Sequence, residues 1–596
     1  MGLGLRSPAF VGRAEELAML DAAAASVDHD GVATVLIGGD AGMGKTRLVE
    51  EWCSRARGVV VATGFCSPVG GQGRPYGPLV GILRDLRRQL ADGPDAGVLV
   101  PVSRALGLTG PEVIDDAMSE AGAPMTITLA KTRLLDTILG CLTTLSDHVP
   151  VVLVFEDLHW ADAATAELID FLTRNMRHGR VMLLGTYRAD ELDTRHPLRE
   201  LVAELGRLRQ VARIQLQGLG RDDIGAMLTA ILGHEAGWAL ADAVYARSEG
   251  NPFFAEELAA ARDATTLPEH LQDLIMIRVD RLSHGARRLL GVIATVGDRI
   301  SHGLLAEVWD PEADPLGPAV DEALDRRLLV VDPVTGDYEA RHALVREAVY
   351  RVLRPDERAD LHRRAAACIE AHPDLAPAGI GQAAAELASH WWAAGEWANA
   401  LTASCAAATA AESVFAFVEA HAHLERALQA WGRAPDAPAR TGTDRAGLLN
   451  RAANAAFLTA NRQRAAELAE EACDAVDATA DPRRAASYLA GLGRNVSAIS
   501  SQAALDAFGR AAALLSEDAP SVERARVLAE HARWLMVMSR SHDAEVLSHA
   551  AIAAARAAGA RAEEGHATNT LGCCLTHTGR PEDGIALIRE ALEIAE

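Results

Sequence analysis

Cysteine is scarce in this sequence of 596 residues, and long apolar runs are missing. The 8 cysteines form no C-x-x-C pair and no zinc-ligand spacing, which excludes a disulfide scaffold and favours reduced thiols. No apolar run approaches the ~18 residues that span a bilayer. Residues 1–10 lack the pattern of a signal peptide. We therefore expect a soluble, cytoplasmic protein without a membrane partner.

Positive charge is also in short supply. Lys and Arg together number 58 against 82 Asp and Glu, so the net charge is −24, and lysine itself is rare. Polyanions are bound by neutralising cations, and the sequence has no Lys/Arg cluster large enough for that. We therefore expect the chain to be a poor non-specific ligand for nucleic acids. The 49% of hydrophobic residues and a length that predicts about four domains indicate an ordinary globular protein.

Residues 1–220 alternate short apolar, β-branched runs with helical patterns. The runs are apolar enough to be buried on both faces, and the alternation predicts a parallel α/β sheet. The strands are expected at residues 32–37, 59–63, 151–155, 181–186 and 213–216. From 221 to 355 the pattern is mostly helical, with one strand-like piece at 328–331 before a turn at 332–337. Beyond 355 the chain is Ala-rich and helical, with a linker or long loop expected at 432–442.

A turn followed by a helix of small and apolar residues recurs near the C-terminal end. It occurs at residues 461–468, 539–546 and 579–586, at offsets of 78 and 40, with a weaker copy near Ser500. A period of 39–40 residues predicts paired helices stacked as a solenoid. The pattern resembles tetratricopeptide repeats, and Leu571-Gly572 stands where that family has its Leu-Gly pair.

A glycine-rich loop carries the clearest chemical signal. Residues 39–46 satisfy the P-loop pattern G-x-x-x-x-G-K-[ST] between an apolar strand and a helix. Backbone N–H groups of such a loop, together with the helix N-terminus, bind phosphate oxygens. We expect Lys45 to reach the β- and γ-phosphates of ATP and the Thr46 hydroxyl to ligate Mg²⁺. The predicted nucleotide-binding residues of the loop are Gly39, Asp40, Ala41, Gly42, Met43, Gly44, Lys45 and Thr46.

Two further apolar strands lead into polar residues. The strand at 151–155 is followed by Glu156 and Asp157, which is the Walker B arrangement with Glu in place of the usual first Asp. We expect Glu156 to hold Mg²⁺, partly through water, and Asp157 to polarise the attacking water. The strand at 181–186 leads to Arg188. If the strands lie side by side, Arg188 would project beside the γ-phosphate as a sensor.

Five segments together carry a resemblance to a known family, namely residues 10–13, 156–162, 186–188, 250–254 and 341–350. With them the chain resembles the STAND class of signal-transduction ATPases. Within that class it is similar to the large ATP-binding LuxR-type regulators of actinobacteria and their relatives. Residues 8–355 resemble the family through specific motifs, whereas residues 356–596 resemble it only in general character.

The resemblance implies roles for residues outside the P-loop. The segment 10–13 would lie against the adenine, with Val11, Gly12 and Arg13 as its nucleotide-binding residues. Pro252 would close the nucleotide pocket, and His342 would contact the β-phosphate of ADP and hold the protein shut. Related proteins often carry Asp after that His, whereas this sequence has Ala343.

The resemblance also implies an order of domains. We expect an AAA+/STAND-like α/β P-loop ATPase domain at 1–220, a small helical domain at 221–262 and a winged-helix domain at 263–355. A helical linker or repeat region would follow at 356–455, and an all-α TPR-like solenoid at 456–596. LuxR-type members end in a helix-turn-helix domain, whereas this chain stops at Glu596 inside a repeat helix. We therefore expect a fragment that contacts DNA only through a domain outside this chain.

These features favour a nucleotide-gated regulatory switch that uses ATP, ADP and Mg²⁺ and hydrolyses ATP slowly. An inducer or a partner protein would bind the helical repeats, and the ATP state would self-associate. Two alternatives stay open. One is a remodelling ATPase, although the sequence has no aromatic pore loop. The other is the regulatory ATPase module of a nucleotide cyclase, because such enzymes have a segment similar to residues 156–160.

Overall fold

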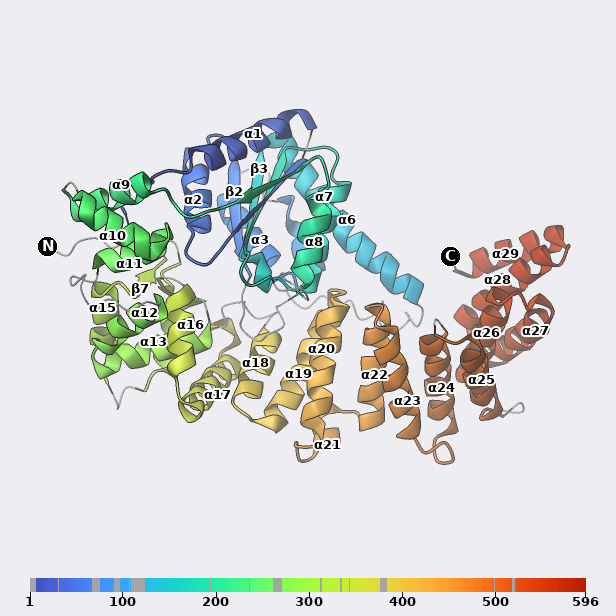
Figure 1. Ribbon diagram of the computed structural model, residues 1–596. Coiled ribbons are helices and arrows are strands. Elements are labelled where there is room, and N and C mark those ends of the chain that lie inside the picture. The colour runs from blue at the N-terminus through green and yellow to red at the C-terminus, as the bar shows by residue number, and fades with distance from the viewer. Residues whose placement is uncertain are drawn as a thin grey trace. The chain divides into compact units, whose positions relative to one another are not determined.

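The computed structural model divides into two compact units, Met1–Glu419 and Ala420–Glu596 (Figure 1). It describes residues 7–595 except 31, 67–74, 91–96, 107, 109–123, 193–195, 235, 261–270, 298, 311–313, 333–334, 342, 376–382, 498 and 517–519. No helix in the described part of the chain combines the length and the apolar character that a membrane span requires.

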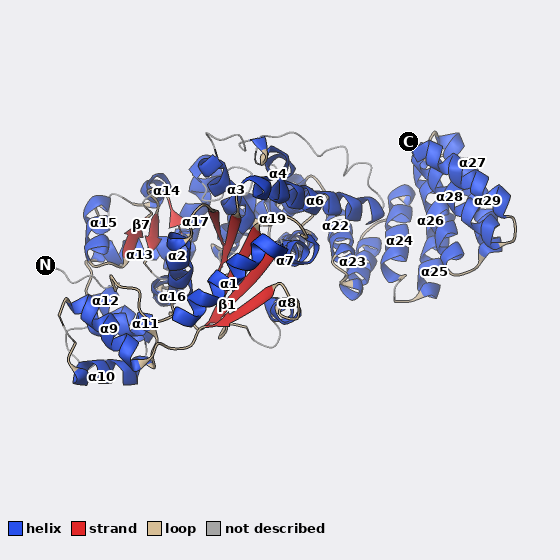
Figure 2. Cartoon of the chain, turned by 90° about the horizontal axis from the view of Figure 1, so that it is seen from above, coloured by secondary structure: helices blue, strands red, loops and turns tan. Residues whose placement is uncertain are grey.

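A parallel sheet organises the N-terminal part of the first unit, as predicted. Its five strands, red in Figure 2, pair in the order β2-β3-β4-β1-β5. Their bounds are β1 (Val32–Gly39), β2 (Val60–Phe65), β3 (Val151–Glu156), β4 (Val181–Arg188) and β5 (Val211–Gln215). Every residue of β1, β3 and β4 is buried, which explains why these strands are the most apolar runs of the sequence.

Helices cover both faces of the sheet. On one face, α1 (Ala14–Asp30) and α2 (Lys45–Arg55) pack Leu20 and Leu48 into one apolar cluster with Val35 and Val154. Side chains alternate between the two faces along a strand, so Thr34 points to the other face, where its hydroxyl lies 3.0 Å from that of Thr173. The helices that contact the strands from that side are α3 (Gly77–Leu90), α6 (Pro124–His148) and α7 (Ala163–Asn175). Further helices are α4 (Val100–Ala105), the short 3₁₀ helix η2 (Leu158–Trp160) and α8 (Pro197–Leu205).

The strand order brings the predicted motifs to one edge of the sheet. Strand β4 lies between β1 and β3, and Arg188 at its end is the register partner of Gly39, the first P-loop residue. Glu156 ends β3 on the other side of β4. The carboxyl ends of neighbouring parallel strands share an edge, so these residues converge there.

The segment after the sheet is helical, with one small antiparallel sheet. Helices α9 (Arg221–Leu232), α10 (Trp238–Ser248) and α11 (Pro252–Ala260) share an apolar cluster. They are followed by α12 (Leu271–Asp280), α13 (His284–Val296), α14 (His302–Val308), α15 (Leu316–Asp325), α16 (Ala343–Val352) and α17 (Pro355–Ala371). Among them β6 (Arg299–Ile300), β8 (Tyr338–Ala340) and β7 (Leu329–Val331) pair in that order, and β7 and β8 flank the predicted turn. This small sheet lies within the segment 263–355, for which a winged-helix domain stays a prediction.

The first unit closes with α18 (Ala383–Ala393) and α19 (Trp397–Ser413), and α20 (Phe417–Trp431) begins in it. The expected loop at 432–442 contains a short helix instead, α21 (Ala437–Thr441). Pro438 favoured the prediction of a loop, because proline is unfavourable inside a helix. It is compatible with the helix that forms because it lies in the first turn of α21.

The second unit contains four antiparallel helix pairs (Figure 1). The first helices of the pairs are α22 (Arg445–Leu458), α24 (Pro482–Val496), α26 (Val522–Val537) and α28 (Arg561–His577). The second helices are α23 (Arg462–Asp474), α25 (Ser501–Ala513), α27 (Ser541–Ala558) and α29 (Pro581–Ala595), which begin 39 or 40 residues apart. This spacing confirms the predicted period. The expected domain boundary at 456 falls inside α22, because the sequence repeat marks the turn before each second helix.

Candidate functional site

The predicted P-loop joins the end of β1 to the start of α2. Gly42 and Gly44 have φ angles of +82° and +86°, in the left-handed region that glycine adopts without strain. A Cβ at Gly42 would also lie 2.8 Å from the Asn251 side-chain oxygen, whereas nothing lies within 4 Å of that position at Gly44. Backbone conformation therefore requires glycine at both positions, and close packing adds a second requirement at Gly42.

Lys45 is the buried cation of the loop. Its Nζ donates hydrogen bonds to the carbonyl oxygens of Gly39 (2.7 Å) and Asp40 (2.9 Å). Burial lowers the pKa of Lys45, while the nearby Asp157 carboxylate opposes that shift. The ammonium group is thus positioned at the phosphate-binding loop, as its predicted role requires.

Glu156 lies between two threonine hydroxyls. Its Oε2 accepts hydrogen bonds from Thr46 Oγ1 (3.1 Å) and Thr186 Oγ1 (2.5 Å). Only 3% of Glu156 is exposed, and this burial raises the pKa of its carboxyl to about 7, although both hydroxyls oppose the shift.

The surroundings of Glu156 fit a magnesium ion. Oxygen ligands suit Mg²⁺, and the two predicted ligands, Thr46 and Glu156, lie within hydrogen-bond distance of each other. The longer glutamate arm therefore still reaches the threonine of the P-loop. Bound Mg²⁺ would favour the ionised carboxylate and neutralise phosphate charge.

Asp157 begins the chain segment beyond β3 with a φ of +58°. Its backbone N–H donates to Thr186 Oγ1 (2.9 Å), and its side chain is 29% exposed with Oδ1 3.9 Å from His159 Nδ1. The two adjacent acids thus have different surroundings. Glu156 is buried beside the P-loop threonine, whereas the Asp157 side chain is accessible to solvent. The role of Asp157 in polarising the attacking water stays a prediction.

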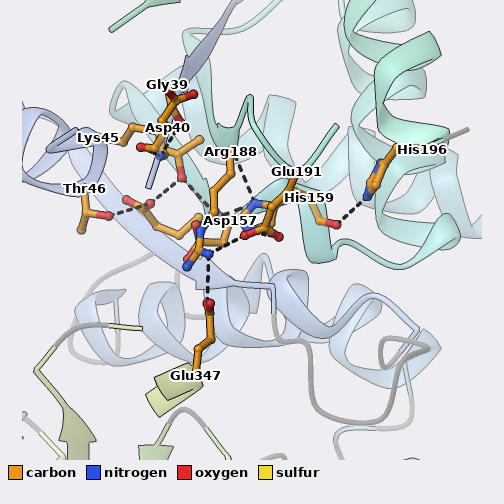
Figure 3. Close-up of polar contacts among 12 residues, drawn as sticks. Gly39, Asp40, Lys45, Thr46, Asp157, His159, Arg188, Glu191, His196 and Glu347 are labelled. Atoms are coloured by element: carbon orange, nitrogen blue, oxygen red, sulfur yellow. Dashed lines mark hydrogen bonds and ion pairs between the residues drawn. The ribbon is translucent and has the colours of Figure 1, made fainter. Parts of the chain in front are cut away.

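Arg188 is buried and held by carboxylates from two segments (Figure 3). Its Nη1 donates to Glu347 Oε1 of α16 (2.9 Å) and also bonds Glu191. The guanidinium carbon lies 4.8 Å from the ring centroid of Trp160, and that of Arg346 lies 5.7 Å from the same ring. Burial disfavours the charge on Arg188, but the two carboxylates outweigh it and raise its pKa.

His159 holds the backbone of Arg188 in place. The backbone N–H of Arg188 donates to His159 Nδ1 (3.3 Å), so that nitrogen is an acceptor. Burial, followed by the charges of Arg188 and Lys45, holds the pKa of His159 well below its usual range. His159 is therefore neutral and fixes the backbone from which the arginine projects.

Contacts from the start of α11 and from the residue before it reach the P-loop. Asn251 Nδ2 donates to the Ala41 carbonyl (2.9 Å), and the Phe253 N–H donates to the Gly42 carbonyl (3.3 Å). Pro252 begins α11 between these two contacts. The sequence motif directed attention to Pro252, whereas the hydrogen bonds come from its neighbours.

The segment before α1 also reaches the loop. Arg13 Nη2 donates to the carbonyl oxygens of Met43 (3.2 Å) and Gln217 (2.7 Å). Val11 packs against the apolar cluster of α9–α11, and Gly12 has a φ of +66°. These three predicted nucleotide-binding residues therefore lie between the P-loop and α9–α11. His342 is outside the described residues.

Comparison with known proteins agrees with the sheet and the P-loop. Residues 9–184 match the family model of the AAA ATPase domain. The first unit therefore contains a P-loop ATPase domain of the AAA type, which implies nucleotide binding, with Mg²⁺ the usual companion.

The chain is also similar to several individual proteins. It is 28% identical over 433 residues to an uncharacterized protein of Rhizobium meliloti (strain 1021), covering 67% of this chain and 40% of the relative. The chain thus spans about two fifths of the length of that curated relative. A STAND protein with a tetratricopeptide repeat sensor from Pyrococcus horikoshii aligns over 99% of this chain and 84% of its own, with 14% identity and a TM-score of 0.43. A RuvB variant of Thermotoga maritima aligns over 59% of this chain and 99% of its own, with 15% identity and a TM-score of 0.24.

Proposed function

We propose that this chain is a nucleotide-gated signal-transduction switch that binds ATP and hydrolyses it slowly. It would be the regulatory part of a LuxR-type transcriptional regulator, with the helical repeats receiving an inducer or a partner protein. DNA contact would belong to a domain outside these 596 residues. The motifs of the sequence support the family, and the arrangement around Arg188 supports the switch.

The ion pair of Arg188 with Glu347 is the observation that carries the proposal. Arg188 is the register partner of Gly39 at the edge where phosphates would bind, whereas Glu347 belongs to α16. A guanidinium group bonds phosphate as readily as carboxylate. The γ-phosphate of ATP would therefore compete with Glu347 for Arg188, and the position of α16 would depend on the nucleotide.

The size of this interaction suits a switch with several contacts. A charge-assisted hydrogen bond contributes about 1.5–3 kcal/mol, whereas moving an equilibrium from 1:99 to 99:1 needs about 5.5 kcal/mol. Glu347 can bias the two states without deciding between them alone. The P-loop contacts of Asn251 and Arg13 would supply part of the remainder.

The test is the nucleotide content and mass of the purified chain. We expect bound ADP in the resting protein, released on denaturation and identified by chromatography, and a monomeric mass by light scattering. Addition of ATP and Mg²⁺ should raise the mass, with slow steady turnover. Fast turnover at constant mass would contradict the switch and favour a remodelling ATPase.

A further inference from the structure

The first turn of α7 is bonded by two acidic side chains. Asp162, the residue before the helix, accepts hydrogen bonds from the Thr165 N–H (2.8 Å) and the Thr165 hydroxyl (2.6 Å). Glu419 of α20 accepts from the N–H groups of Ala163 (2.7 Å) and Ala164 (3.4 Å) through Oε1. A helix leaves its first N–H groups without partners of its own, and one capping side chain is the usual solution. Here a carboxyl group from a distant helix completes the cap.

Both acids are withdrawn from water. Asp162 is 5% exposed and Glu419 only 3%. The Asp162 carboxylate is well bonded, because the Tyr76 N–H also donates to it (3.1 Å). Oε2 of Glu419 is instead buried without a hydrogen-bond partner in the part of the chain that the structure describes. A buried carboxylate ion with an unbonded oxygen is unfavourable, so the neutral, protonated form of Glu419 suits this position better.

Acidic and neutral groups surround this pair. The titratable groups near it are Glu167 of α7, which pairs with Lys131, the buried Tyr76 and Cys66, and His423, one turn further along α20. Burial raises the pKa of Tyr76 and of Cys66 and lowers that of His423 to about 4, so all three are neutral. Burial, and after it the charge of Asp162, raises the pKa of Glu419 to about 7. Two acids this close titrate as a pair, and near neutral pH the pair keeps one proton, which Glu419 holds.

Glu419 joins two different parts of the chain. On one side, only η2 and Ala161 separate Asp157, the predicted water-polarising acid, from Asp162 at the start of α7. The position of Asp157 therefore depends on how the start of α7 is held. On the other side, α20 begins in the first unit and continues into the second.

We propose that Glu419 is a positioning residue for Asp157 and the point at which α20 acts on the ATPase site. While protonated Glu419 bonds the first turn of α7, the segment that follows Asp157 is held in place. A movement of α20, or loss of the Glu419 proton to solvent, breaks these bonds and frees the segment. The inference deepens the proposed function, on which it rests for the hydrolysis of ATP and for a signal that the helical repeats receive.

Hydrogen exchange of the full chain without nucleotide tests the contact itself. Protection factors of the peptides that begin α7, which contain Ala163 and Ala164, are measured by mass spectrometry at several pH values. We expect protection to fall as the pH rises from about 5 to about 7, by up to tenfold per pH unit, because the bonded state holds a proton that the open state releases. Glu419→Gln should keep the protection and lose its pH dependence, because the amide oxygen accepts the same bonds and does not titrate.

Two further variants complete the exchange experiment. Glu396→Gln is the matched control, because Glu396 forms an exposed ion pair with Arg363 in the same unit, and it should behave like the wild type. Asp162→Asn keeps a capping residue but removes the charge that raises the pKa of Glu419. Its protection should therefore stop falling at a lower pH than in the wild type. Protection that Glu419→Ala leaves unchanged, or a wild-type pH dependence in Glu419→Gln, would overturn the contact.

Single-turnover hydrolysis tests the positioning role. Glu419→Ala should slow hydrolysis about tenfold or more, because a small displacement of a catalytic group has an effect of that size. ATP affinity should be unchanged, since the P-loop binds the nucleotide, and Glu419→Gln should restore the rate. An equal loss of affinity and rate in Glu419→Ala, or no restoration by Glu419→Gln, would overturn the positioning role. A wild-type chain that hydrolyses no ATP would refute the proposed function, whereas the exchange measurement would still show whether Glu419 holds α7.

Discussion

Glu347 of α16 holds the guanidinium of Arg188 at 2.9 Å, beside the P-loop glycine that is Arg188's register partner. The two residues are 159 positions apart in the sequence. An arginine at this edge of the sheet can bind either this carboxylate or a phosphate, and the competition links the nucleotide to α16.

Glu347→Gln should therefore favour ATP over ADP. The amide keeps the shape of the side chain but loses its charge, so Arg188 is held less firmly away from phosphate. We expect the ratio of ATP to ADP affinity to rise about tenfold, the lower end of what one charged hydrogen bond supplies. Fluorescent-nucleotide competition measures it. Glu357→Gln, which alters an exposed ion pair with Arg354 on α17, is the matched control. An unchanged ratio in Glu347→Gln would show that the ion pair is only structural.

Lys45→Ala should abolish tight nucleotide binding without unfolding the chain. Lys45 bonds only to loop carbonyls among the described residues, so its loss removes phosphate binding and little packing. Lys131→Ala is the control, because Lys131 is a surface lysine paired with Glu167. Nucleotide titration compares the two variants. Wild-type affinity in Lys45→Ala would refute the assignment of the P-loop.

The two acids after β3 should separate binding from hydrolysis. Asp157→Asn should bind ATP normally and hydrolyse it more slowly, because an amide cannot accept the proton of the attacking water. Glu156→Gln should instead weaken the part of binding that depends on Mg²⁺. Titrations with and without Mg²⁺, followed by single-turnover hydrolysis, distinguish the two effects. The opposite pattern would mean that the roles are exchanged.

The pKa of Glu156 predicts a pH dependence. Burial raises it to about 7 from an ordinary value of 4.5, so the folded chain binds a proton that the unfolded chain releases. The free energy of unfolding should therefore fall as the pH rises from about 4.5 to about 7. Binding of Mg²⁺ requires the ionised form. The gain in ATP affinity that Mg²⁺ provides should thus increase as the pH rises through about 7. This increase with pH should be absent in Glu156→Gln. A gain of constant size across this range would contradict the role of Glu156.

Several features of this fold are readable from the sequence because local chemistry determines them. Buried parallel strands need continuous apolar runs, and the five runs before residue 220 became the five strands of the sheet. The loop of Gly42 and Gly44 needs left-handed backbone, so its glycines identify it. Strands β6 and β8 were missed because they are two and three residues long and carry Arg299 and Glu339. Their strand conformation comes from the pairing of β8 with β6 on one side and with β7 on the other.

Partners across long distances were not readable. Nothing near Glu347 in the sequence indicates that it meets Arg188, because the contact depends on how α16 packs. Asn251 belongs to the segment 250–254 that carries the family resemblance, but nothing in that segment indicates that its amide bonds the P-loop. In both cases the missing information is tertiary, since a charged or polar side chain has many potential partners and the fold selects one.

Gly572 and Gly584 pack against each other where α28 crosses α29. A Cβ on Gly572 would lie 2.8 Å from the Gly584 carbonyl oxygen and 2.8 Å from Ile588 Cγ1, closer than atoms can approach without a shift. This contact explains why the Leu-Gly pair of the repeat needs its glycine. Gly572→Ala should therefore separate the two helices and destabilise the second unit by about 1–3 kcal/mol, the usual effect of overpacking.

Gly509 provides the matched control in the same unit. It lies inside α25 with nothing within 4 Å of its Cβ position, so Gly509→Ala should stabilise the helix by about 0.5–1 kcal/mol, because alanine has the higher helix propensity. Urea unfolding followed by circular dichroism gives both values. The opposite signs are the essential result, because propensity alone would make both substitutions stabilising. If Gly572→Ala also raised the midpoint, the two helices would not be in the close contact that the glycines allow, and the Leu-Gly pair would have no packing role.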